Sequence, residues 1–234
     1  ALDVRNSGSR PVLMLEGELL EGGWQSRALV RDLILAPRSS HRVDVSCVEQ
    51  HRWGGEVSHE RRARRASPRV QMALRGDDLF RQERVWDGVR RYDETTGPTA
   101  TSSLADHIDR LDALAPLVPV AGQRGVLVGV GGQPLALELF GSAPALAAHL
   151  ASIIEAARLD ALLVDTPTTT MPGRRARRMT ARLSTTRLEQ GREFVGDGVS
   201  IGASTPGMVV RGVTTQSGGL AHLSVLNTQH PVMA

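Results

Sequence analysis

One stretch of the chain constrains the fold more than any other: a β-hairpin followed directly by a long helix, between residues 124 and 163. The apolar runs RGVLVGV and QPLALELFG flank Gly131-Gly132, which supply the positive φ angles of a two-residue turn. Ser142 comes next as the N-cap of an alanine-rich helix. The apolar stripe of that helix consists of Leu146, Leu150, Ile153 and Ile154. Because this stripe needs a sheet to cover, the chain is expected to belong to the α+β class.

Further strands are expected near both ends of the chain. PVLMLE (11–16), WQSRALVRDLILAP (24–37) and RVDVSCVEQ (42–50) are β-rich runs joined by short polar or glycine turns. We expect them to form one antiparallel meander, sandwich-like, with several helices packed on it. Late strands near 193–204, 207–214 and 220–227 are expected to join the same sheet system, so that residues 1–234 form a single domain.

Helical spacing appears between residues 70 and 92, and Asp77 or Asp78 is a candidate N-cap. Ser102 or Ser103 can cap a second helix that ends before Pro116. Two polar stretches, 54–69 and 165–178, each contain the run RRARR and lack periodicity. They are expected to be exposed, the first as a long loop and the second as a linker.

Composition limits the function classes. The 28 basic side chains are all arginine and the net charge is only +3, which is weaker than the footprint of most nucleic-acid-binding proteins. Nucleic acid therefore stays a possible but less favoured partner, bound through the two RRARR runs. The single cysteine excludes an internal disulfide framework and suits a cytoplasmic location. No apolar run is long enough to span a membrane, and the first residues do not resemble a signal peptide.

Functional side chains gather where two of the expected strands end. Gln25 and Arg27 share one strand face, Cys47 and Glu49 share a face of the next, and Arg52-Trp53 follows beyond it. If these strands pair, an amide, a guanidinium, an acid and an aromatic ring form a pocket for an anionic small molecule. The alternative is that an Arg27–Glu49 salt bridge only joins the strands while Trp53 caps the core.

The pattern of these motifs resembles a bacterial family named for its association with ADP-ribosylglycohydrolases and rhodanese-type phosphatases. The resemblance rests on Glu16-Gly17-Glu18, Gly22-Gly23-x-Gln25-x-Arg27, Val45-Ser46-Cys47-Val48-Glu49-x-x-Arg52-Trp53, Gln82-x-x-Val85-Trp86 and the hairpin of residues 125–140. It covers about residues 1–165, which leaves 166–234 as a C-terminal elaboration. Since genomic neighbours of this family act in NAD and ADP-ribose metabolism, the resemblance implies a nucleotide-derived ligand and adds Gln82 and Trp86 to the candidate site.

We therefore expect a pocket protein that binds a nucleotide-derived or phosphorylated small molecule. Whether the protein also processes this molecule stays open at this point. The rival hypothesis is a non-enzymatic interaction module whose arginine-rich loops contact an acidic protein or nucleic acid. If the protein is catalytic, Cys47, Glu49 and His51 are the candidates, with Cys47 as nucleophile and His51 as its base. The histidine spacing matches no metal motif, so no metal or other cofactor is expected. A homo-oligomer is compatible with the sequence.

Overall fold

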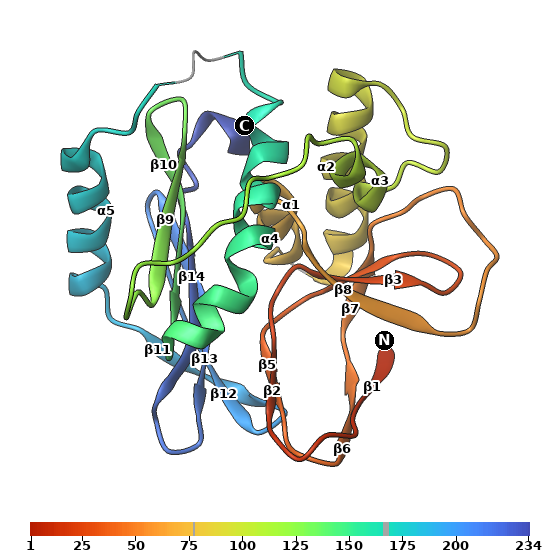
Figure 1. Ribbon diagram of the computed structural model, residues 1–234, viewed down its shortest axis with the longest axis horizontal. Helices are drawn as coiled ribbons and strands as arrows, with labels where there is room; N and C mark the ends of the chain where they lie inside the picture. The colour runs from red at the N-terminus through yellow and green to blue at the C-terminus, as the bar shows by residue number, and fades with distance from the viewer. Residues whose placement is uncertain (77, 166–168) are drawn as a thin grey trace.

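The computed structural model describes residues 1–76, 78–165 and 169–234. Within them the chain forms helices and antiparallel sheets, which confirms the α+β class (Figure 1). The strands are β1 (Leu2–Asn6), β2 (Val12–Met14), β3 (Glu18–Gly22), β4 (Arg27–Leu29), β5 (Leu33–Leu35), β6 (Ser39–Val43), β7 (Val45–Cys47), β8 (His59–Arg65), β9 (Gly125–Val130), β10 (Gln133–Phe140), β11 (Glu189–Val195), β12 (Gly198–Thr205), β13 (Met208–Thr215) and β14 (Leu220–Leu226). The helices are α1 (Pro68–Leu74), α2 (Arg81–Thr96), α3 (Leu104–Asp109), α4 (Ala143–Ala161) and α5 (Gly173–Thr185), with short 3-10 turns η1 (Asp78–Phe80) and η2 (Pro231–Met233).

The largest sheet has six strands in the order β11-β12-β13-β14-β10-β9. The expected β9–β10 hairpin forms one edge of this sheet, and its Gly131 and Gly132 both adopt positive φ angles, 56° and 71°. The late strands join this hairpin because β14 pairs with β10. Helix α5 covers one face of the sheet, where Met179 contacts Leu137 and Val225.

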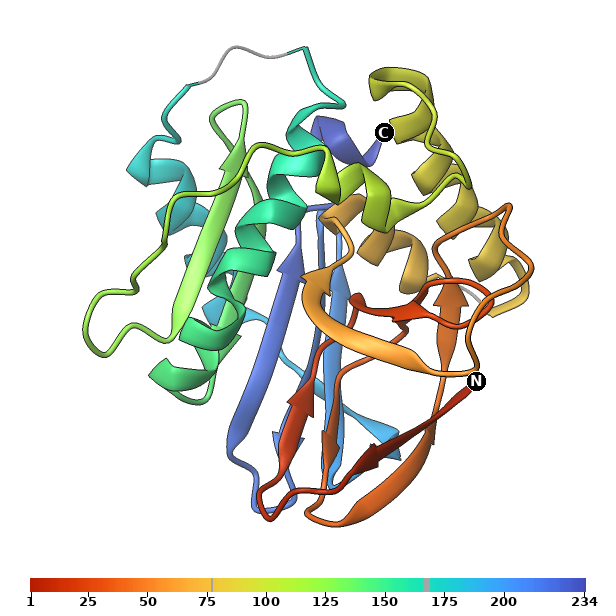
Figure 2. The same cartoon turned by 45° about the vertical axis from the view of Figure 1, so that its right-hand side comes forward.

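Helix α4 lies on the opposite face of this sheet, as Figure 1 shows. Ser142 caps it, since its side chain accepts the N–H of Ala145 at 3.3 Å. The expected apolar stripe is buried: Leu146, Leu150 and Ile153 form a cluster with Leu15 and Phe140. The N-terminal strands stand beside α4 on the same side of the sheet (Figure 2).

The strands of residues 11–50 do not form one sheet, and that expectation was wrong. Together with β1 and β8 they divide into the pairs β1-β6 and β2-β5 and the four-stranded sheet β7-β4-β3-β8. The run 24–37, expected as one strand, is broken between β4 and β5 at Arg31-Asp32. The Asp32 carboxylate is buried and accepts the N–H of Glu16 at 2.7 Å, so the chain leaves the β-ladder there to place this side chain inside the protein.

Both RRARR runs are regular secondary structure rather than loop or linker. The first lies in β8, which pairs with β3, and the β3 carboxylates of Glu18 and Glu21 bond Arg61 and Arg64. The second begins α5, whose Met179 supplies the anchor to the sheet. Residues 166–168 of the expected linker lie outside the described residues.

The helices between residues 68 and 110 follow the expected pattern only in part. Ser103 caps α3 as expected, accepting the N–H of Asp106 at 3.3 Å, but the helix ends at Asp109 rather than near Pro116. Helix α2 begins after Phe80 without a side-chain cap; Asp78 starts the η1 turn, and Asp77 lies outside the described residues. Among the described helices, none is long and apolar enough to cross a membrane.

Candidate functional site

The structure brings four of the residues singled out in the sequence into mutual contact. Arg27 stands directly opposite Cys47 in the β4–β7 pair. Its Nη1 donates to Gln25 Oε1 at 3.0 Å and contacts Cys47 Sγ. The amide of Gln82, from α2, bonds the backbone N–H and C=O of Cys47 at 2.8 and 2.9 Å. The Gln82 side chain therefore satisfies the backbone groups of Cys47 that a further strand would bond at this edge of the sheet.

Glu49 pairs with Arg52 rather than with Arg27. The carboxylate and guanidinium form two parallel bonds, Nε to Oε1 at 2.8 Å and Nη2 to Oε2 at 2.7 Å. Burial by itself would raise the pKa of Glu49, but bonds from Arg52, Ser26 and Thr101 lower it to about 2. Arg52 also donates to the carbonyl of Gly23 at 2.6 Å, so the pair fastens the Gly22-Gly23 turn.

The remaining candidates do not converge on one point. Trp53 is 70% exposed, so it does not cap the core, and His51 is exposed as well. Burial raises the pKa of Cys47, and the nearby charge of Arg27 only partly opposes this, which keeps the thiol protonated at neutral pH. Trp86 is half-buried, and its Nε1 is buried with no hydrogen-bond partner among the described residues.

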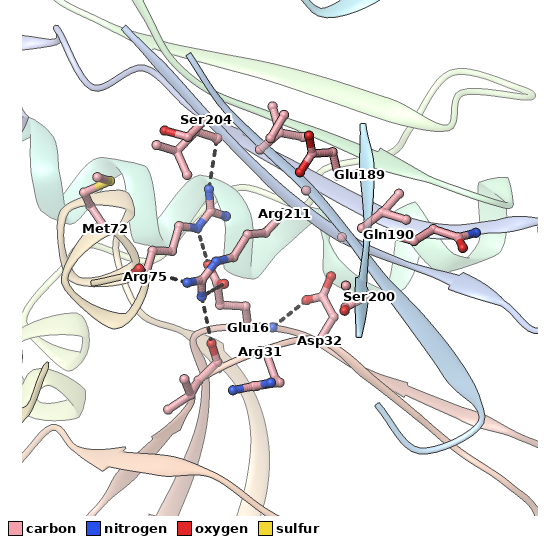
Figure 3. A pocket seen from close by; sticks show the side chains of 18 of the residues that line it. Glu16, Arg31, Asp32, Met72, Arg75, Glu189, Gln190, Ser200, Ser204 and Arg211 are labelled. Carbon is pink, nitrogen blue, oxygen red and sulfur yellow. Dashed lines mark hydrogen bonds and ion pairs between the residues drawn. The ribbon is translucent and has the colours of Figure 1, made fainter. Parts of the chain in front are cut away.

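A cavity of about 640 Å³ lies where the N-terminal strands and the starts of the helices meet the six-stranded sheet (Figure 3). We call it the arginine cavity. Its polar lining comes from the β2–β3 and β4–β5 links, the end of α1, the start of α2 and the strands β11 to β13. The charged side chains that line it are Glu16, Arg31, Asp32, Arg75, Arg81, Glu189 and Arg211.

The register of the six-stranded sheet explains why charged side chains line the arginine cavity and why the cavity is open. Glu138, Ser224 and Arg211 stand opposite one another on β10, β14 and β13, and the row continues through Gly202 to Glu189. Directly paired residues project from the same face of an antiparallel sheet. Because Gly202 has no side chain, the row is open between Arg211 and Glu189, and the cavity occupies this gap.

Two arginines hold Glu16 at the wall of the arginine cavity. Arg75 Nε donates to Glu16 Oε1 at 2.6 Å, and Arg211 Nη1 donates to Oε2 at 3.2 Å (Figure 3). Arg75 and Glu16 are both buried, and Arg75 also donates to Ser224 Oγ at 2.8 Å. Since both carboxylate oxygens accept guanidinium N–H groups, Glu16 acts as a structural clamp between the two halves of the chain.

Behind this wall, His222 lies between two carboxylates in the core. Its Nδ1 is 2.7 Å from Asp32 Oδ2, and its Nε2 is 2.7 Å from Glu138 Oε2. Burial opposes the charged imidazole, but the two carboxylates raise the pKa of His222 to about 9. Burial would likewise raise the pKa of Asp32 and Glu138, and it is outweighed by cations, chiefly His222 for Asp32 and Arg65 for Glu138, so both pKa values are lowered.

Three of the cations that line the arginine cavity lie close enough to repel one another. Burial lowers the pKa of Arg81, and the positive charges of Arg31 and Arg211 lower it further. Arg31 faces Asp44 at 3.8 Å and is partly exposed, as is Arg211. Like charges that converge on a half-enclosed space produce a positive potential, which favours an anionic ligand.

Sequence reasoning did not identify the arginine cavity, although a signal was present. Asp32, Glu138 and His222 each interrupt an otherwise apolar strand run, in VRDLIL, LALELF and LAHLSV. A charged residue inside such a run has to be satisfied in the interior, and this makes it a candidate for a functional network.

Fold and site together define an α+β protein with a buried ionic network and an arginine-lined cavity between its two halves. A family model described as the ARG and Rhodanese-Phosphatase-superfamily-associated Protein domain matches residues 1–226. The chain therefore belongs to this family, and the match takes in the C-terminal strands that the resemblance noted in the sequence did not reach. No curated protein and no solved structure matches the chain.

Proposed function

We propose that this protein binds a small phosphorylated molecule of the nucleotide-derived class in the arginine cavity. The observation that carries the proposal is the convergence of Arg31, Arg81 and Arg211 on one cavity of about 640 Å³. Guanidinium groups bind phosphate oxygens with two parallel hydrogen bonds, and a cavity of this volume has the size of a small-molecule site.

The arginines divide into two roles. Arg75 is buried, and its guanidinium is occupied by Glu16, Ser224 and the carbonyl of Val209. Arg31 and Arg81 also line the cavity, and we assign these two side chains to the ligand. Arg211 lines it as well and bonds Glu16. Ser200 and Ser204, which line the cavity from β12, supply hydroxyls for further hydrogen bonds.

The proposal is one of binding. Among the described lining residues there is no histidine or cysteine, and both oxygens of Glu16 accept arginine N–H groups. The family description associates these domains with ARG and with rhodanese-phosphatase proteins, which agrees with a ligand that carries phosphate or ADP-ribose. The cluster of Gln25, Arg27 and Gln82, predicted from the sequence as a ligand site, is not part of this proposal. Its polar groups bond mainly to one another and to the Cys47 backbone, so ligand binding there stays a separate prediction.

Calorimetric titration with ADP-ribose, NAD and ADP tests the proposal. Arg81→Gln and Arg31→Gln should each weaken binding about 10- to 100-fold, the effect of losing a charge-assisted bond of about 1.5–3 kcal/mol. Arg91→Gln is the matched control, because Arg91 lies on the same helix as Arg81 and pairs with Glu94 on the exposed face. Absence of binding across the panel, or equal affinity in the Arg81 variant and the wild type, would contradict the proposal.

A further inference from the structure

A second and larger cavity, of about 1060 Å³, lies where residues 8–13, strand β8 and the first turns of α4 meet. We call it the β8 cavity. Four arginines line it, and three of them come from the first RRARR run: Arg10, Arg61, Arg64 and Arg65. We propose that the β8 cavity binds the phosphate group of a small molecule, at a site distinct from the arginine cavity.

Arg65 is the first observation that points to a ligand. The residue is 2% exposed, and its Nε donates to the carbonyl of Glu16 at 2.9 Å. Nη1 lies 3.0 Å from Glu138 Oε1, but neither Nη1 nor Nη2 has a hydrogen-bond partner among the described residues. A buried guanidinium normally has its N–H groups satisfied, and Glu138 already neutralises Nη1. The Nη2 donors of this lining residue are the ones that call for an acceptor from outside the chain.

Helix α4 supplies a second, independent contribution. It is 19 residues long, and its N-terminus lies on the rim, where Ser142 and Ala145 line the cavity. The N–H of Ala145 already bonds Ser142, so the helix contributes the positive end of its dipole more than free donors. Anions are stabilised at such a position.

Arginines outnumber carboxylates among the described residues that line the β8 cavity, although each of them except Arg10 is paired with an acid. Among the described lining residues, Glu18 is the one carboxylate, and Arg61 already neutralises it. Arg64 is bonded to Glu21 and Asp109, whereas the exposed side chain of Arg10 makes no hydrogen bond or ion pair within the described part of the chain. Burial and the charges of Arg61, Arg65 and His222 lower the pKa of His149, at the wall, to about 4. Burial is the main reason that this imidazole is neutral, and the cations that contribute to its neutrality also favour a bound phosphate.

The two cavities lie on opposite sides of one buried network. Arg65 reaches Glu138, which accepts a bond from Ser224 at 3.0 Å, and Ser224 accepts one from Arg75 in the wall of the arginine cavity. They share no cation, since the arginines of the β8 cavity come from residues 10 and 61–65 and those of the arginine cavity from other elements. Substitution of arginines in one cavity can therefore test ligand binding there without changing the other cavity.

The test uses inorganic pyrophosphate, titrated into the full chain by calorimetry while the His149 ring is followed by NMR. Arg10→Gln and Ser142→Asp are the informative variants, because Arg10 is exposed and aspartate preserves the N-cap of α4. Arg62→Gln is the matched control: it changes the net charge by the same amount, lies in the same strand and pairs with Glu60 outside the cavity. Arg81→Gln reports on the arginine cavity.

Pyrophosphate should bind the wild type, Arg62→Gln and Arg81→Gln, and should raise the pKa of His149 from about 4 because the bound anion offsets the surrounding cations. Arg10→Gln and Ser142→Asp should each weaken this binding at least about fivefold, as expected for a lost or added charge beside a phosphate. ADP, titrated in parallel into Arg81→Gln so that the arginine cavity contributes little, distinguishes a nucleotide from free phosphate by its tighter binding. An unchanged His149 resonance, or wild-type affinity in both informative variants, would overturn the proposal.

Discussion

His222 and Asp32 stand 190 positions apart in the chain, and their side chains meet in the core at 2.7 Å. One comes from β14 in the C-terminal sheet and the other from the break between β4 and β5. The bond therefore joins the two halves of the protein, and Glu138 completes it on the other ring nitrogen at 2.7 Å. Both the fold and the wall of the arginine cavity depend on the charge state of this histidine.

Stability should fall as the pH rises from about 6.5 to about 9. The pKa of His222 is raised to about 9 in the folded protein, against 6.5 for an ordinary histidine. Its contribution is fully present below about pH 6.5 and is lost as the pH rises through the folded value, with a size on the order of 3 kcal/mol. Urea unfolding at pH 6, 7.5 and 9 measures this, and His222→Gln should flatten the slope. A wild-type stability that is constant across this window would show that His222 is not charged in the fold.

Breaking the clamp on Glu16 should destabilise the protein far more than changing a surface arginine. Arg75→Met leaves the buried Glu16 carboxylate without its closest partner, which costs about 3–5 kcal/mol. Arg91→Met removes an exposed pair with Glu94 and should cost about 0–1 kcal/mol. Chemical denaturation of both variants gives the comparison, and similar losses in the two would contradict the assignment of Glu16 as a buried clamp.

The features that the sequence could predict are those set by neighbouring residues. The β9–β10 hairpin follows from two adjacent glycines, and the Ser142 and Ser103 caps follow from the residues next to them. The approach of Arg27 to Cys47 was also expected, but β4 and β7 pair across the intervening β5 and β6 rather than through a short turn. In the hairpin and the two caps the deciding interaction spans few residues, so local pattern is sufficient.

The features that escaped prediction depend on partners far along the chain. The run at 61–65 has the composition of a solvated loop, and only the carboxylates of β3, 43 positions away, make it a strand. Glu138 and His222 form one network through contacts 84 positions apart. The three small N-terminal sheets could not be predicted either, because the burial of Asp32 interrupts a run that propensity alone would continue.

Acid should weaken the Glu49–Arg52 pair. Bonds from Arg52, Ser26 and Thr101 lower the pKa of Glu49 to about 2 against the opposing effect of burial, and the ordinary value is 4.5. The stability that this pair provides is therefore present above about pH 4.5 and is lost as the pH falls through about 2. Acid unfolding followed by circular dichroism should show a shallower decline in Glu49→Gln, which starts from a lower stability at pH 7. A parallel decline in the two proteins would mean that Glu49 titrates normally in the fold.

Cys47 should react slowly with alkylating reagents, which bears directly on the hypothesis that it is a nucleophile. Burial raises the pKa of its thiol, and the reactive species is the thiolate. Arg27 is the cation that opposes this shift, so Arg27→Ala should raise the pKa further and slow alkylation again. Because the chain has one cysteine, the rate of iodoacetamide labelling measured against pH reports on Cys47 alone. His51→Ala should leave the profile unchanged, since His51 is exposed and makes no contact with Cys47 in the described part of the chain. A labelling pKa below that of a free cysteine, lost in the His51 variant, would instead establish the two residues as a nucleophile and its base.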